Sequence, residues 1–167
     1  QVEKNITELY EYGGYTEINI KGLYWMQGCN NRTEPAEYQV AFEYFADDVR
    51  ADLSDLMKKF TGSSDDLGAS EMSIIVGTIS QTQNLTDASI EENVNKPFVE
   101  MQKGLADVIE NCYVVDNSQY AITRWNTGTG NAEVLGSDQW HWNQADALEI
   151  GYNVGELIVN EILTENN

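Results

Sequence analysis

The stretch Ile18-Asn19-Ile20-Lys21-Gly22-Leu23-Tyr24-Trp25, which runs on into Met26-Gln27-Gly28, decides the fold of this chain. Apolar residues alternate with polar ones at its start and then become continuous, as expected for a strand that is covered on both faces. We therefore predict a buried parallel strand over residues 18–25. It ends immediately before a short polar turn.

A long helix is predicted directly after that turn, over residues 35–60. Pro35 can occupy a first-turn position, where its missing N–H costs nothing. The apolar positions of the segment fall on one stripe, as expected for a helix that packs on a sheet. The stripe consists of Tyr38, Phe42, Phe45, Val49, Leu53 and Leu56.

The rest of the chain alternates between helical and strand patterns. The further predicted elements are a helix over 2–10, a strand over 72–79, a helix over 90–110 in which Pro97 marks a start or a kink, a strand over 112–115 and a helix over 143–163. This alternation is typical of a parallel sheet with helices on both faces. We predict a single α/β domain over residues 1–167, with a three-layer, doubly wound parallel sheet. Because a complete domain of this type has more strands, we expect the first strand or strands to lie outside this chain.

The composition excludes several partners. The chain has 167 residues, of which 41% are hydrophobic, and its 28 acidic and 9 basic residues give a formal net charge of -19. Such a charge repels phosphate backbones and anionic lipid surfaces, so we expect neither nucleic acid nor a membrane as a partner. No acidic cluster has the spacing of a calcium loop, and we expect no metal site.

The termini and cysteines leave the location open. Residues 1–4 lack both an initiator methionine and the apolar core of a signal peptide, so we expect a processed or truncated product. Cys29 and Cys112 are too few for a disulfide framework. An extracellular and a cytoplasmic location are both compatible with these features.

His141 is the only histidine of the chain, and Asp138 precedes it by three residues. A carboxylate that fixes the tautomer of an imidazole, and an imidazole that takes up a hydroxyl proton, are two members of a serine-hydrolase triad. Trp140 and Trp142 flank the histidine, and a histidine in an aromatic patch is also a common hydrogen-bonded packing residue. The residues alone leave both interpretations open.

Two segments together resemble a known family. Trp25-Met26-Gln27-Gly28 follows a strand with a W-x-Q-G pattern, and Asp138-Gln139-Trp140-His141, with Asn143 and a closing helix behind it, follows a D-x-x-H pattern. In their order and separation these blocks resemble the SGNH-hydrolase superfamily, and within it the sialate O-acetylesterase-like carbohydrate esterases. The resemblance implies a flavodoxin-like sheet. It also implies hydrolysis of O-acetyl esters on a carbohydrate through an acyl-enzyme, without a metal or an organic cofactor.

The resemblance also assigns roles to residues. It makes His141 the general base and Asp138 the residue that orients it. The negative oxygen of the tetrahedral intermediate needs fixed donors, and Gln27 would supply one through its side-chain amide, with Asn30 as the alternative. Trp140, Trp142 and Gly28 are expected to contact the substrate, because indole rings stack on sugar faces.

This chain departs from the family at two points. Cys29 stands where the carbohydrate esterases usually have Glu, and no serine block precedes the W-x-Q-G segment. We therefore expect the nucleophilic serine on a missing N-terminal segment or on another chain. In its absence strand 18–25 would have an open apolar edge, which favours pairing with that segment or with a second copy.

Other functions remain possible from the sequence. Ser80, at the end of strand 72–79, is the best serine within the chain, although it lacks a nucleophile-elbow context. Cys29 is a further candidate nucleophile, because a thiolate with a histidine can perform acyl transfer. The alternatives from other classes are a noncatalytic carbohydrate-binding module and a structural half-domain that serves assembly.

Overall fold

A computed structural model describes residues 1–83, 92–120, 122 and 140–164. The order of its elements is α1 (Val2–Glu11), β1 (Gly22–Trp25), η1 (Cys29–Asn31), α2 (Pro35–Thr61), η2 (Ala69–Glu71), β2 (Ser73–Gly77), α4 (Lys96–Val108), β3 (Cys112–Val115), α6 (Gln144–Leu157) and η3 (Ile158–Ile162). The strands form a parallel three-stranded sheet in the order β1-β2-β3. The predicted alternation of helices and strands around a parallel sheet is thus confirmed.

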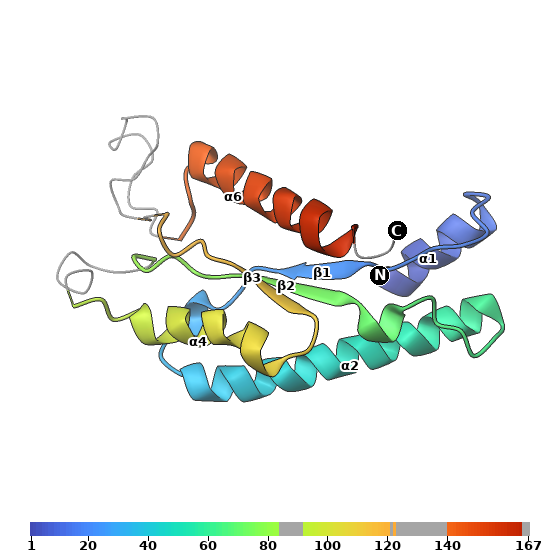
Figure 1. Cartoon of the computed structure of the whole chain (residues 1–167), viewed down its shortest axis with the longest axis horizontal. Coiled ribbons are helices and arrows are strands. Elements are labelled where there is room, and N and C mark those ends of the chain that lie inside the picture. Colours follow the sequence, from blue (N-terminus) through green and yellow to red (C-terminus); the bar gives the residue numbers. More distant parts are fainter. Residues whose placement is uncertain (84–91, 121, 123–139, 165–167) are drawn as a thin grey trace.

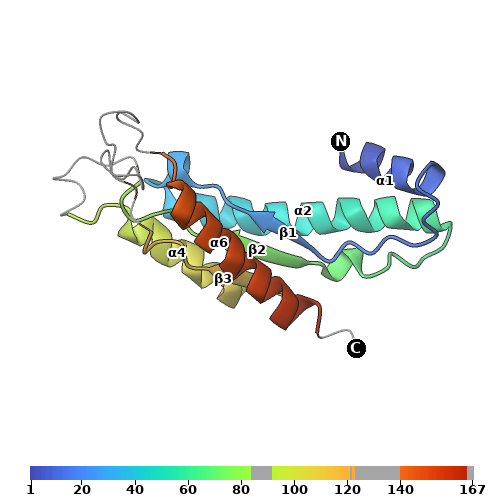
Figure 2. The same cartoon turned by 90° about the horizontal axis from the view of Figure 1, so that it is seen from above.

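The sheet lies between two layers of helices (Figure 1). Helices α2 and α4 lie along one face of the sheet and α6 lies on the other. Seen from above, α6 passes over the strands at an angle (Figure 2). The helices on both faces are as expected. Within the described residues both crossover helices, α2 and α4, pack on the same face, and the second face is covered by the helix that follows β3.

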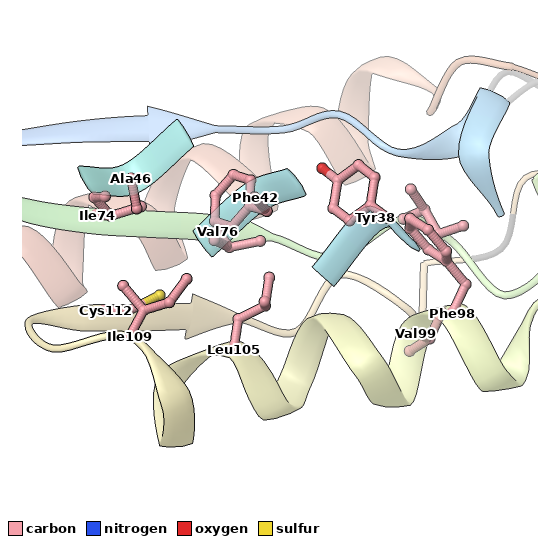
Figure 3. Close-up of a cluster of buried hydrophobic side chains, with 11 residues drawn as sticks. Tyr38, Phe42, Ala46, Ile74, Val76, Phe98, Val99, Leu105, Ile109 and Cys112 are labelled. Atoms are coloured by element: carbon pink, nitrogen blue, oxygen red, sulfur yellow. The ribbon is translucent and has the colours of Figure 1, made fainter. Parts of the chain in front are cut away.

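The main core fills the space between the sheet and the helices α2 and α4 (Figure 3). Ile74 and Val76 of β2 point toward this side, where they meet Phe42, Phe98 and aliphatic side chains of both helices. Burying a side chain of this size contributes about 1.5–3 kcal/mol. The core therefore fixes both crossover helices relative to the strands, and with them the loops at the ends of the strands.

Strand β1 differs from its prediction. It covers only Gly22–Trp25, and exposed and half-buried residues alternate along it, so the expected coverage on both faces is wrong. The reason is that β1 has one neighbour, β2, while α6 packs on Ile75 of β2 and Val115 of β3. Ile18 and Ile20 pack instead beside α1 and the end of α2. The open edge that the sequence predicted for this strand is present within the described residues.

Helix α2 has its predicted bounds to within one residue, but its buried stripe is rotated. The buried side chains are Tyr38, Phe42, Ala46, Arg50, Ser54 and Met57, and the predicted Phe45, Val49, Leu53 and Leu56 are half-buried. Two polar residues lie on this stripe where the second half of α2 crosses the amino ends of the strands. Ser54 donates to Asp66 Oδ2 at 2.6 Å. Arg50 donates to the carbonyl oxygens of Met72 and Glu110 at distances of 2.6–3.1 Å.

The later helices are shorter than predicted. Helix α4 begins at Lys96 rather than near residue 90, and Pro97 stands in its first turn, so the proline marks a start and not a kink. Asn143 caps α6 through a 2.9 Å bond from the Asp146 N–H, and the helix ends in a π-helical turn at Ile162. Ala147, near the start of α6, is exposed.

Candidate functional site

A pocket of about 590 Å³ opens at the carboxyl ends of β1 and β2. Open parallel sheets bind ligands at this edge. The lining comes from the turn after β1, the loop after β2, the segment before α6 and the start of α6 itself. It consists of Met26, Gln27, Gly28, Cys29, Asn30, Ile79, Gln83, Trp140, His141, Trp142 and Ala147.

The pocket brings together both segments that carried the resemblance. Gln27, Gly28 and Asn30 belong to the segment after β1. Trp140, His141 and Trp142 lie more than a hundred residues later in the sequence. Asp138 lies outside the described residues. The pocket therefore unites the described residues to which the resemblance assigned a role, and the contact between Asp138 and His141 lies outside the described residues.

Packing holds the turn after β1 in one conformation. Gly28 has a φ of 139°, and a Cβ at this position would lie 2.6 Å from Cε1 of Phe98. Only glycine fits here without strain. The Gln27 carbonyl oxygen accepts hydrogen bonds from the Tyr38 hydroxyl (3.2 Å) and from Gln102 Nε2 (3.1 Å). The backbone of Gln27 is thus fixed, and its side chain remains exposed.

Gln102 is a residue of this region that the sequence analysis missed. It is fully buried on α4, and its Oε1 accepts a 2.8 Å bond from the Ile79 N–H while its Nε2 holds the Gln27 carbonyl. One side chain therefore joins the ends of β1 and β2. The available signal was a glutamine in line with Phe98 and Leu105 on the apolar face of a helix.

Both predicted oxyanion donors, Gln27 and Asn30, belong to the lining of the pocket. Gln27 and Asn30 line the pocket, and Gln27, which is exposed, donates from Nε2 to Asn31 Oδ1 at 3.2 Å. A side-chain amide carries two N–H donors, so this bond leaves Gln27 a second one. Both amides can therefore present a donor to an oxygen in the pocket.

Two hydrogen bonds hold the histidine segment. The Trp140 carbonyl accepts from Gln83 Nε2 at 2.7 Å, and the Trp142 indole N–H donates to the Tyr120 carbonyl at 3.0 Å. His141 itself is exposed, and the Trp140 side chain is 39% exposed. The imidazole is thus on a segment that is held on both sides of His141, through the Trp140 backbone and the Trp142 indole.

The two nucleophile candidates within the chain have different surroundings. Ser80 is fully buried, and its hydroxyl donates to the Tyr120 carbonyl at 2.7 Å and accepts from the Thr82 and Ile122 N–H groups. It is not part of the pocket lining and has a structural role. Cys29 is half-buried, is not in a disulfide and lines the pocket.

The pocket is neutral although the chain is strongly acidic. Its described lining contains no carboxylate and no lysine or arginine, and His141 is its one titratable group besides Cys29. Across the described ranges, no three His, Cys, Asp or Glu side chains gather as metal ligands. The helices that the structure describes are too short or too polar to cross a bilayer.

Comparison of the chain with models of known protein families, with curated proteins and with solved structures gave no match. The fold and the site therefore define a three-layer α/β protein with a neutral, aromatic pocket at the carboxyl edge of its sheet. Any more specific function has to come from the geometry of that pocket.

Proposed function

We propose that this chain supplies the general base and the oxyanion donors of a carbohydrate O-acetylesterase. One observation carries the proposal. Gln27, Asn30 and His141, singled out by their motifs in two distant segments, line one pocket. A purely structural role for these residues gives no reason for them to share a cavity.

In this proposal His141 takes the proton of a serine hydroxyl as the oxygen attacks the ester carbonyl carbon. The carbonyl oxygen becomes negative, and the amides of Gln27 or Asn30 donate hydrogen bonds to it. The sugar oxygen leaves with the proton from His141, and an acetyl-serine forms. Water then attacks the acetyl group, with His141 again as base, and acetate leaves. Asp138 orients the imidazole.

The serine would come from a segment outside this chain. Among the described residues that line the pocket none is a serine, and Ser80 is buried away from it. The open edge of β1 is next to the turn that carries Gln27, so a strand paired there would end close to the pocket. An additional polypeptide segment, or a second copy of the chain, would supply such a strand.

The substrate class follows from the lining. The pocket holds no fixed charge among its described residues, and Trp140 and Trp142 offer indole faces, which suits a neutral sugar that carries an acetyl ester. The net charge of -19 disfavours anionic substrates such as phosphate esters. The proposed reaction needs no cofactor.

The test uses the complete protein, checked by intact-mass spectrometry for a second polypeptide, with p-nitrophenyl acetate and an O-acetylated sugar as substrates. We expect His141→Ala to lower kcat/KM by roughly a thousandfold or more, because a lost triad base has effects of this size. Lys4→Ala, on the exposed face of α1, is the control and should leave activity unchanged. Full activity in His141→Ala would contradict the proposal.

A noncatalytic carbohydrate-binding module is the second candidate. It is favoured by the same lack of a serine in the described lining, together with the two indoles. Saturable binding of an O-acetylated sugar without release of acetate, in a preparation of confirmed full length, would select this function over the esterase.

A further inference from the structure

A second cavity adjoins the candidate site. It has a volume of about 280 Å³ and lies between β1 and α6. Met26, Trp142 and Ala147 line both this space, which we call the apolar cavity, and the pocket that contains His141. A ligand that fills the pocket on the Trp142 side is therefore next to the apolar cavity. The two spaces form neighbouring parts of one site.

The described lining of the apolar cavity offers a ligand neither a charge nor a free side-chain donor. It includes Tyr24 from β1, Met26 and Trp142 from the adjoining turns, and Ala147, Ile150 and Gly151 from α6. The Tyr24 hydroxyl donates to Met26 Sδ at 3.3 Å, and the Trp142 indole N–H donates to the Tyr120 carbonyl at 3.0 Å. Both side-chain donors are thus already used, and the remaining surface suits an apolar group.

The two cavities differ in the chemistry of their walls. The pocket presents the amides of Gln27 and Asn30 and the imidazole of His141, and the described lining of the apolar cavity contains none of these. A sugar needs polar partners, whereas an alkyl or aryl group needs none. Sites for small molecules commonly combine a few polar groups with apolar walls, in volumes of about 300–1,000 Å³. The pair of cavities is therefore suited to a ligand with a polar part and an apolar part.

We propose that the apolar cavity binds an alkyl or aryl group that is attached to the carbohydrate in the pocket. This inference rests on the proposed function and narrows its substrate to an amphiphilic one. The group is either the aglycone of the acetylated sugar or a second, longer acyl ester on the same sugar. Both sources bind for the same physical reason, because apolar surface leaves water when the chain enters the cavity.

Gly151 allows the apolar cavity to be filled by a single substitution. It lies one helical turn after Ala147 on α6, and a Cβ at its position meets no atom within 4 Å. Gly151→Leu therefore adds a large apolar side chain at the wall of the cavity without a steric clash, and leucine favours a helix more than glycine does. Gly155→Leu is the matched control, because Gly155 has the same open space on the same helix and does not line the cavity.

The experiment measures binding to the full-length protein by intrinsic tryptophan fluorescence, since Trp142 lines both cavities. The first two probes are hexyl and methyl glucopyranoside, each with a single O-acetyl group. We expect the wild-type protein and Gly155→Leu to bind the hexyl compound about tenfold more tightly, as for about two buried methylene groups. Gly151→Leu should bind both compounds alike.

A third probe distinguishes the two sources of the apolar group. Methyl glucopyranoside with one O-acetyl and one O-hexanoyl group carries the chain on a different sugar oxygen. Tighter binding of the hexyl glycoside that is lost in Gly151→Leu identifies an aglycone, and the same result with the hexanoyl ester identifies a second acyl group. If neither chain gives a gain that Gly151→Leu removes, the inference is wrong, and binding of the methyl compound leaves the proposed function standing.

A second measurement does not depend on the folding of any variant. Acetylated sugars with chains of increasing length at either position are titrated into the wild-type protein below their micelle concentrations. A cavity of about 280 Å³ holds a limited number of carbons, so we expect the affinity to rise with chain length at one position and then to level off. An affinity that never rises, or that is still rising for a decyl chain, would overturn the inference. If no acetylated sugar binds the wild-type protein, both the inference and the proposed function fail.

Discussion

The two ends of the sheet differ in whether their buried polar atoms have hydrogen-bond partners. At the amino ends of the strands, Arg50 is buried and donates to two backbone carbonyl groups. The buried Ser54 donates to the half-buried Asp66, which also accepts from the Gly68 N–H. At the carboxyl ends, buried side-chain atoms of Gln83, Asn95 and Asn117 have no partner among the described residues.

This difference separates polar groups that are satisfied within the fold from polar groups that are buried without a hydrogen-bond partner. A satisfied network stabilises the native state and gives a ligand nothing to bind. Unpaired buried atoms lower stability, and natural proteins retain them where function requires. Tyr10, whose buried hydroxyl also lacks a partner among the described residues, is an exception outside the carboxyl end. The other unpaired atoms belong to residues that follow β2 or β3 or cap α4.

The largest effect should come from the amino end. Arg50→Met keeps an apolar side chain but leaves the carbonyl groups of Met72 and Glu110 without their donor, so we expect a loss of about 3 kcal/mol of unfolding free energy in urea. Arg32→Met is the control, since Arg32 donates to the Cys29 carbonyl from a half-buried site and should cost less than half as much. Equal losses of unfolding free energy in Arg50→Met and Arg32→Met would contradict the distinction between the amino and carboxyl ends of the sheet.

The turn of the pocket should tolerate change poorly. Gly28→Ala would place a Cβ against Phe98 at a positive φ, and we expect a loss of about 2 kcal/mol in unfolding free energy, as for an overpacked core, together with weaker ligand binding. Gly104→Ala on α4 meets no atom within 4 Å and should instead raise stability by about 0.5–1 kcal/mol. Similar effects of both substitutions would contradict the role of the turn as a tightly packed support for Gln27.

Much of this framework follows from local sequence signals. Strand β3 was predicted with its observed bounds, and β2 and the long α2 nearly so, because runs of apolar residues and a first-turn proline act locally. The prediction was wrong for β1, because the exposure of its residues depends on elements that are distant in the sequence. The exposure of Tyr24 depends on how far α6 reaches across the sheet, which no residue of β1 encodes.

The candidate site was predictable only in part. Motif spacing identified Gln27, Asn30 and His141 as candidates, and the fold brings them to one pocket. Gln83 was missed because a glutamine that bonds to a backbone carbonyl has no sequence pattern of its own. The signal for Gln102, a polar position on the apolar face of a helix, does not name its partners. Their importance depends on burial and on partners far away in the chain.

A pH titration of stability tests the role of Asp66 at the amino end of the sheet. The hydrogen bonds from Ser54, and then those from Ser70 and Gly68, lower the pKa of Asp66 from 3.8 to about 2. Because the folded pKa is the lower one, the stabilisation is complete above the unfolded pKa of 3.8 and is lost as the pH falls toward 2. The urea midpoint of the wild-type protein should therefore fall more steeply over this window than that of Asp66→Asn, whereas parallel curves would contradict this role.

The smallest effect concerns the cysteines. Burial raises the pKa of the Cys112 thiol to about 11, so iodoacetamide at neutral pH should modify Cys29, which is half-buried in the pocket, more than about tenfold faster. An O-acetylated sugar should slow the modification of Cys29 and leave that of Cys112 unchanged. Peptide mass spectrometry measures both rates, and a sugar without effect on Cys29 would place its binding elsewhere.

The most direct test of the pocket uses the single histidine of the chain. Its Cε1–H proton gives one NMR signal that belongs to His141, which can be followed while singly O-acetylated methyl glucopyranoside is added to the full-length protein. The proposed function predicts a saturable shift of this signal as the sugar is added. A signal that keeps its position at the highest sugar concentration would contradict the assignment of this pocket to acetylated carbohydrates.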